Sequence, residues 1–120
     1  MKKIIFSQKL IKKEKLSSKE KLLVIKVCQK NIFTKIKGKD LPSESSLIKI
    51  YITTIDGAKR LVMILDEVLD IGYFLMFRKK EDSIGKNMTL KNPDFKKALS
   101  QYLDILDADM NENNFEIIDI

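Results

Sequence analysis

The spacing of apolar residues predicts a strand and a helix in the first part of the chain. Residues 4–6 (Ile-Ile-Phe) form a short apolar run that we interpret as a first or edge strand. In the Lys-rich segment after it, Leu10 can lie on the apolar face of a short helix. Ser17 and Glu20 have the spacing of a reciprocal capping box, which predicts that a helix begins there. Apolar residues then recur at three- and four-residue intervals and define a buried stripe: Leu23, Val24, Val27 and Cys28.

The apolar period changes to two in the middle of the chain. Glycine, proline and serine residues first predict a loop over residues 36–46. Residues 47–53 then alternate isoleucine with polar or aromatic residues, the pattern of a half-buried strand. Asp56-Gly57 is a strong hairpin signal, so residues 59–66 are expected to form the return strand. Residues 71–78 are apolar on both faces, which is typical of a central strand covered by helices.

The last part of the chain predicts a long amphipathic helix. Asn92 can cap this helix, Pro93 suits its first position and Asp94 complements its dipole. Its apolar stripe contains Phe95, Leu99, Tyr102, Leu103, Leu106 and Met110. The acidic residues predicted to lie outside this stripe are Asp104, Asp107 and Asp109. Residues 111–114 are expected to end the helix, and residues 115–120 can form a last short strand.

In this order the elements predict an α+β fold, with N-terminal helices packed on a small antiparallel sheet and an additional C-terminal helix. The chain has 120 residues, 44% of them hydrophobic, which suits one domain over residues 1–120 and excludes a disordered tail. The apolar run near the start is cut short at Ser7, so neither a signal peptide nor a membrane span is expected. We therefore expect a cytoplasmic protein with no membrane partner.

Charge is distributed unevenly along the chain. There are 23 Lys and Arg residues against 17 Asp and Glu residues, a formal net charge of +6. Residues 1–40 hold 13 lysines and 3 acidic residues, whereas residues 91–120 hold 3 lysines and 7 acidic residues. A basic surface attracts a polyanion, most often nucleic acid. The alternative is a solvated helix face in a Lys-rich chain.

The composition excludes several kinds of site. With no histidine and one cysteine, an imidazole base, a zinc site and an intramolecular disulfide are excluded. The glycines are too far apart for a phosphate-binding loop. We therefore expect no metal and no cofactor. Cys28 lies on the predicted apolar stripe with no histidine to activate it, so we interpret it as a core residue.

Basic residues on and beside the predicted sheet form the candidate site: Lys49, Lys59, Arg60, Arg78, Lys79, Lys80 and Lys86. Pairing across the Asp56-Gly57 turn brings Lys49 near Arg60, and the next strand adds Arg78. Like charges that face one another on a sheet destabilise it unless an anion lies between them, and Arg binds phosphate oxygens in a bidentate way. The alternative is that these are charges that protect strand ends and sheet edges.

In order and type, these features resemble the RelE/ParE superfamily of toxins from bacterial type II toxin–antitoxin modules. The resemblance covers about residues 15–90 and follows a basic helical front. It rests on residues 37–42 (Lys-Gly-Lys-Asp-Leu-Pro), 48–51 (Ile-Lys-Ile-Tyr), 59–65 (Lys-Arg-Leu-Val-Met-Ile-Leu) and 77–80 (Phe-Arg-Lys-Lys). It implies a RelE-like fold and, for RelE-like members, ribosome-dependent cleavage of mRNA by attack of a ribose 2′-oxygen on the adjacent phosphate.

The resemblance also implies roles for matching residues. Lys49 would position or polarise the phosphate, Arg60 would stabilise the pentavalent transition state, and Arg78 would bind the backbone or assist the leaving oxygen. The cations implied to bind RNA around them are Lys59, Lys79, Lys80 and Lys86. Such electrostatic catalysis needs no metal and no cofactor. The implied partners are a cognate antitoxin protein and RNA on the ribosome.

The chain departs from the family pattern after residue 80. Many RelE-like chains end there in an Arg-rich strand with an aromatic acid/base, whereas this one continues into a loop and a long helix. Tyr102 lies on the apolar stripe of that helix and is interpreted as a core residue, so the acid/base is unassigned. Two other functions therefore stay open: a ParE-like toxin that targets DNA gyrase, and a non-enzymatic module that binds nucleic acid or an acidic protein.

Overall fold

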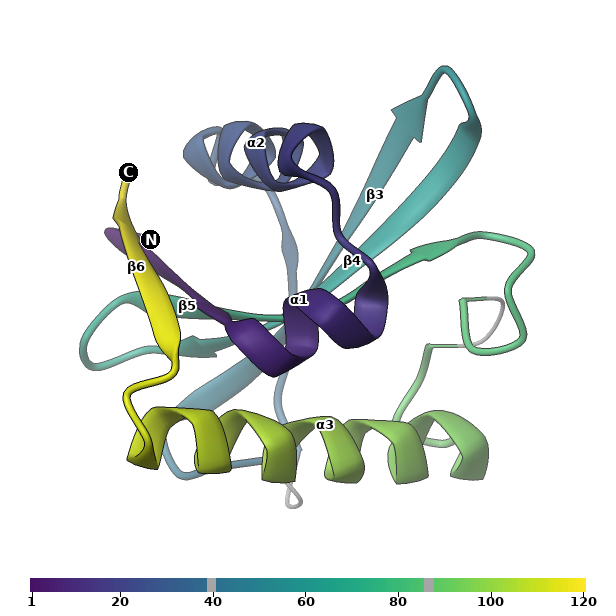
Figure 1. The fold of residues 1–120 in the computed structure, drawn as a ribbon. Coiled ribbons are helices and arrows are strands. Elements are labelled where there is room, and N and C mark those ends of the chain that lie inside the picture. Colours follow the sequence, from purple (N-terminus) through teal and green to yellow (C-terminus); the bar gives the residue numbers. More distant parts are fainter. Residues whose placement is uncertain (39–40, 86–87) are drawn as a thin grey trace.

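A mixed six-stranded sheet is the middle layer of an α+β fold in this computed structural model (Figure 1), which describes residues 1–38, 41–85 and 88–120. The elements are β1 (Lys3–Ser7), α1 (Gln8–Glu14), α2 (Ser18–Gln29), β2 (Thr34–Ile36), β3 (Ser45–Thr54), β4 (Gly57–Asp66), β5 (Ile71–Lys79), α3 (Pro93–Asn111) and β6 (Phe115–Asp119). The strand order is β2-β3-β4-β5-β1-β6. Helices α2 and α3 lie on opposite sides of the sheet, with α1 between them (Figure 1).

The first strand makes the sheet mixed, which corrects the prediction of a small antiparallel sheet preceded by helices. Strand β1 pairs in parallel with β5 and antiparallel with β6, while β2 to β5 are antiparallel throughout. Ile4 and Phe6 are fully buried because β1 lies between two strands rather than at an edge. A three-residue apolar run cannot distinguish these two positions, since neither the partner strand nor its direction is encoded locally.

Helix α2 begins as predicted, with Ser17 as its cap. Ser17 Oγ accepts a hydrogen bond from the Glu20 N–H, and Glu20 Oε1 accepts one from the Ser17 N–H, both at 3.1 Å. Val24 and Cys28 are buried, and Cys28 Sγ lies 3.5 Å from Met63 Sδ. Burial raises the pKa of the Cys28 thiol to about 12. The interpretation of Cys28 as a core residue is therefore confirmed.

The predicted β3–β4 hairpin forms and pairs all ten residues of each strand, but β4 begins at Gly57 instead of Lys59, so the turn is Ile55-Asp56 rather than Asp56-Gly57. A two-residue turn joins the strands, and Gly57 has a φ of 111°, which an L-residue rarely adopts. The loop predicted over residues 36–46 is too long, because Ile36 belongs to β2 and β3 already begins at Ser45. Short strands such as β2 form through pairing, here with residues 47–49 of β3, so their own sequence signal is weak.

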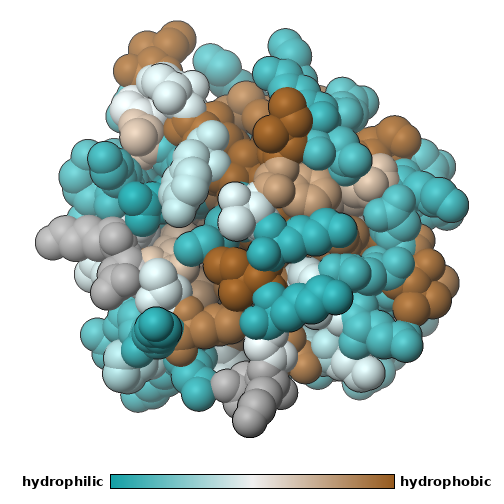
Figure 2. Space-filling view, turned by 180° about the vertical axis from the view of Figure 1, so that it is seen from behind, coloured by the Kyte–Doolittle hydropathy of each residue, from teal (hydrophilic) through white to brown (hydrophobic). Residues whose placement is uncertain are grey.

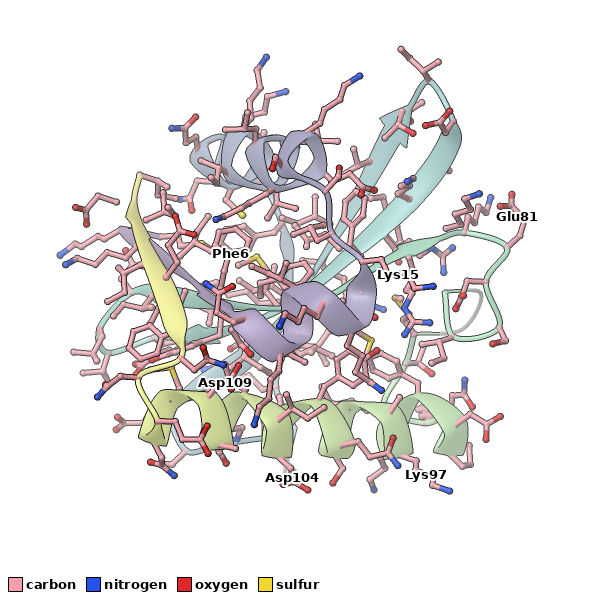
Figure 3. All side chains as sticks on the ribbon, in the orientation of Figure 1. Phe6, Lys15, Glu81, Lys97, Asp104 and Asp109 are labelled. Carbon is pink, nitrogen blue, oxygen red and sulfur yellow. The ribbon has the colours of Figure 1, made fainter. Side chains whose placement is uncertain are left out.

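Helix α3 has the predicted cap and most of the predicted stripe. Asn92 Oδ1 accepts from the Asp94 N–H at 3.2 Å, and Phe95, Leu99 and Leu106 are buried. Asp109 contradicts the prediction, because it is fully buried and points toward α1, while Asp104 points away (Figure 3). No helix in the described part of the chain combines the length and apolar character needed to cross a bilayer.

Candidate functional site

Strand pairing brings together three of the basic residues predicted to form the site. Arg60 on β4 lies opposite Tyr51 on β3 and opposite Arg78 on β5. Residues that pair in antiparallel strands point to the same face of the sheet, and Lys49 is two residues from Tyr51 on the same strand. Lys49, Arg60 and Arg78 therefore share one face with Tyr51, which we call the arginine face.

Arg78 is neutralised by carboxylates from within the protein. Its Nε lies 2.8 Å from Glu14 Oε1, its Nη2 lies 2.9 Å from Glu14 Oε2, and its Nη1 lies 3.3 Å from Asp82 Oδ1. Glu14 is almost completely buried, and hydrogen bonding to it raises the pKa of Arg78 further above its ordinary value. The Arg78 charge is thus used to join β5 to the end of α1.

Tyr102 completes this network from α3. Its hydroxyl donates to Glu14 Oε2 and accepts from Arg78 Nη2, each at 2.6 Å. Burial raises the pKa of Tyr102 to about 12, and the hydrogen bond to Glu14 adds to the rise. Tyr102 is 2% exposed, which confirms that it is a core residue.

Lys49 and Arg60 have neutral partners instead of carboxylates. Lys49 Nζ donates to the Met88 carbonyl at 2.8 Å, and Arg60 Nη1 donates to the Gly85 carbonyl. The segment after β5 therefore reaches back to this face of the sheet. A carbonyl accepts a hydrogen bond without cancelling the donor's charge, so among the described residues both side chains keep a net positive charge.

An open hollow of about 280 Å³ lies beside Arg60. Its lining residues are Tyr51, Ile52, Thr53, Ala58, Lys59, Arg60 and Lys80. The Arg60 guanidinium carbon lies 5.0 Å from the centre of the Tyr51 ring, and Tyr51 is 62% exposed. A planar guanidinium held on an exposed aromatic ring, with a second cation on the rim, suits an anion such as a phosphate and an adjacent flat group.

The other predicted cations do not all belong to this hollow. Lys59 and Lys79 pair with each other and occupy the opposite face of the sheet, although Lys59 also lines the hollow. Lys59 Nζ lies 3.1 Å from Glu20 Oε2 and 5.2 Å from the Phe77 ring centre. Lys80 is exposed at the rim. Lys86 lies outside the described residues.

Glu20 links the capping box of α2 to Lys59. Burial would raise the pKa of Glu20, but hydrogen bonds from the Ser17 backbone and from Lys59 outweigh this effect and lower it. Glu20 therefore stays ionised and holds Lys59 against α2. Lys59 is thus a supporting residue in this arrangement, while Arg60 and Lys80 line the hollow without a carboxylate partner among the described residues.

Tyr51 is the site residue that the sequence reasoning did not select. The alternation of residues 47–53 placed it on the polar face beside Lys49, and an exposed aromatic residue on a basic face is the signal that could have identified it.

Within the described residues, no group of three or more His, Cys, Asp or Glu side chains could hold a metal ion. Comparison with protein-family models, with curated proteins and with solved structures gives no significant match for this chain.

Proposed function

We propose that this protein is the toxin of a type II toxin–antitoxin module and acts as a RelE-like mRNA interferase. The observation that carries the proposal is Arg60, a cation without a carboxylate partner among the described residues, stacked on exposed Tyr51 beside an open hollow. A scissile phosphodiester fits the chemistry of such a hollow better than a neutral ligand does, because the guanidinium can bind two of its oxygens.

Three residues of the hollow have a direct role in this mechanism. Arg60 stabilises the extra negative charge of the pentavalent phosphorus while the bond from the ribose 2′-oxygen forms and the bond to the leaving 5′-oxygen breaks. Tyr51 offers an aromatic surface on which an unpaired base can stack, the usual way in which single-stranded RNA is held. Lys80 attracts the neighbouring phosphate. Lys49 lies further along β3 on the same face and is placed to orient the RNA strand. Arg78 keeps β5 in register beside Arg60.

The partners in this proposal are RNA on the ribosome and a cognate antitoxin in the same cytoplasm. The positive charge of residues 1–40 supports RNA on the ribosome as a partner, because a basic surface increases the rate at which a protein meets ribosomal RNA. The antitoxin would neutralise the toxin until it is degraded. A small reading frame beside the gene would support this assignment directly.

Growth arrest on induced expression in bacteria is the test. We expect Arg60→Ala to relieve the arrest and to lower cleavage of ribosome-bound mRNA by about 100-fold, because one preorganised group that stabilises transition-state charge is lost. The matched control is Lys97→Ala, which removes an exposed cation that points away from the sheet (Figure 3). Normal growth and intact transcripts at confirmed expression of the wild-type protein would refute the proposal.

A second candidate is a non-enzymatic module that binds nucleic acid. It is favoured by the pairing of Arg78 with Glu14, which removes one of the three predicted catalytic cations from the reaction. This candidate predicts RNA binding that weakens steeply with salt, without growth arrest. A ParE-like gyrase toxin would instead cause DNA damage while translation continues, so the same induction experiment separates all three functions.

A further inference from the structure

Strand β3 has a free edge over half of its length. It runs from Ser45 to Thr54, but β2 pairs only with residues 47–49. Residues 50–54 (Ile-Tyr-Ile-Thr-Thr) are therefore unpaired on the side away from β4, within the part of the chain that the structure describes. This segment has high strand propensity and contains no charge and no proline, the features that usually protect an exposed edge.

The hairpin geometry shows which backbone groups this edge presents. Thr54 and Gly57 flank a two-residue turn and form the first pair of the hairpin. In such hairpins this pair exchanges hydrogen bonds and the next pair does not, so alternate residues face away from the partner strand. The N–H and C=O groups of Thr53 and Tyr51 therefore point outward. A further strand can use both residues for backbone hydrogen bonds.

Two hollows of different chemistry flank the projecting end of the hairpin. On one face is the cationic hollow beside Arg60 described above. A larger groove of about 790 Å³ lies between the hairpin and the start of α2, lined in part by Leu23, Ile55 and Phe77. Thr53 lines both hollows, so the free edge lies between them. The hairpin end projects at the upper left in Figure 2, where the surface is hydrophobic (brown) or of intermediate hydropathy (white).

We propose that the free edge at residues 50–54 binds an extended segment of a partner protein in which apolar and acidic residues alternate. Side chains of an added strand point alternately to the two faces of the sheet. The apolar residues would enter the groove beside Leu23 and Phe77, and the acidic residues would face Arg60 and Lys80. This proposal does not rest on the RNA-cleaving function, because it concerns binding to the edge alone.

Charge argues against a second copy of the chain as the occupant. A two-fold pairing of β3 with β3 of another copy would place two Arg60 and Lys80 clusters on the same face of the joined sheet. Such a pairing would add positive charge to that face without supplying an opposite charge, whereas acidic side chains at alternate positions complement both cations.

The probe is a capped peptide of about eight residues that alternates valine and glutamate, labelled for fluorescence anisotropy. We expect saturable binding at least about tenfold tighter than that of the same peptide with lysine in place of glutamate. Hydrogen exchange of the protein's backbone amides, measured with the unlabelled glutamate peptide bound, is the structural readout. The peptide is expected to slow exchange at the Tyr51 and Thr53 amides and to leave the amides of β6, at the other edge of the sheet, unchanged.

Thr53→Pro is the matched variant, because it removes an outward N–H at a position where an edge strand tolerates proline. We expect it to weaken peptide binding by about tenfold, while Thr53→Val, which keeps the N–H, binds as the wild type does. Should Thr53→Pro unfold, the exchange experiment on the wild-type protein decides. Equal binding of the glutamate and lysine peptides, protection at β6 instead of β3, or a dimer that protects Tyr51 and Thr53 without peptide would overturn the proposal.

Discussion

At the scale of single residues, the partner of each basic side chain decides what it can do. Arg78 and Lys59 face carboxylates and therefore hold elements together. Lys49 and Arg60 face backbone carbonyls and keep their charge for another anion. The four residues look equivalent in the sequence, but among them only Arg60 combines this charge with exposed Tyr51 and an open hollow.

Asp109 shows the same principle for an acidic residue. Its carboxylate accepts hydrogen bonds from Ser7 Oγ, from the Lys9 N–H at 2.9 Å and from Asn114 Nδ2 at 3.1 Å. Burial would raise the pKa of Asp109, but these hydrogen bonds outweigh it and lower the pKa. The buried carboxylate on α3 thus accepts hydrogen bonds from the N-terminal turn of α1, and it joins two helices that are far apart in sequence.

We expect Asp109→Asn to lower the free energy of unfolding at pH 7 by about 2 kcal/mol, because charge-assisted hydrogen bonds are lost in a buried site. A lowered pKa in the folded state means that the carboxylate stabilises the protein above about pH 4, its unfolded value, and that this stability is lost as the pH falls further. The difference between variant and wild type should therefore shrink below about pH 4 in urea titrations. Asp107→Asn, at an exposed position on α3, is the control. A difference that does not change with pH would contradict this role.

At the scale of elements, α2 and the β3–β4 hairpin depend on each other. The capping box that starts α2 also positions Glu20, which binds Lys59 on β4. The same helix start forms one wall of the large groove beside the hairpin. A local sequence signal, Ser17 with Glu20, therefore fixes both the start of the helix and one wall of this groove.

Ser17→Ala is expected to destabilise the protein by about 1 kcal/mol, because the Glu20 N–H loses the side-chain oxygen that accepts its hydrogen bond. Ser18→Ala, one residue later and inside the helix, is the matched control and should stay within about 0.5 kcal/mol of the wild type. Chemical unfolding followed by circular dichroism measures both. Equal effects of the two substitutions would show that the cap contributes nothing particular at Ser17.

At the scale of the whole molecule, the two ends of the chain lie side by side in the sheet. Strand β6 pairs with β1 along all five of its residues, and the Ile120 N–H donates to the Lys2 carbonyl at 3.0 Å. Both termini are at the same end of the molecule in Figure 1. The acidic last strand also meets the basic front of the chain, as in the ion pair between Lys21 and Glu116.

A chain that ends at residue 114 is therefore expected to be less stable by about 3 kcal/mol or more. Removal of β6 exposes the edge of β1, where Ile4 and Phe6 are fully buried, and removes the half-buried Ile118. Ile117→Thr is the control, because that side chain is 50% exposed and the strand stays in place. A melting temperature of the truncated chain equal to that of the wild type would contradict a structural role for β6.

The sequence by itself determined the elements whose signals are local. The capping box at Ser17, the Asn92 cap and the hairpin near Gly57 each involve a few consecutive residues, and the structure has all three, with the turn itself at residues 55–56. The alternation over residues 47–53 also placed Lys49 and Tyr51 on one face of a strand correctly. Such signals can be read without a fold because each depends on hydrogen bonds or side-chain directions within one segment.

The tertiary structure alone decided the rest, because these features depend on residues far apart in the chain. Residues 4–6 could be predicted only as an edge or a first strand, whereas the structure places them between β5 and β6. Asp109 was predicted to lie outside the apolar stripe of its helix, whereas the structure buries it against Ser7 and Asn114. The pairing of Arg78 with Glu14 spans 64 residues. The sequence shows which residues are charged, but whether a charge is neutralised or free to bind a ligand depends on the partner that folding places beside it.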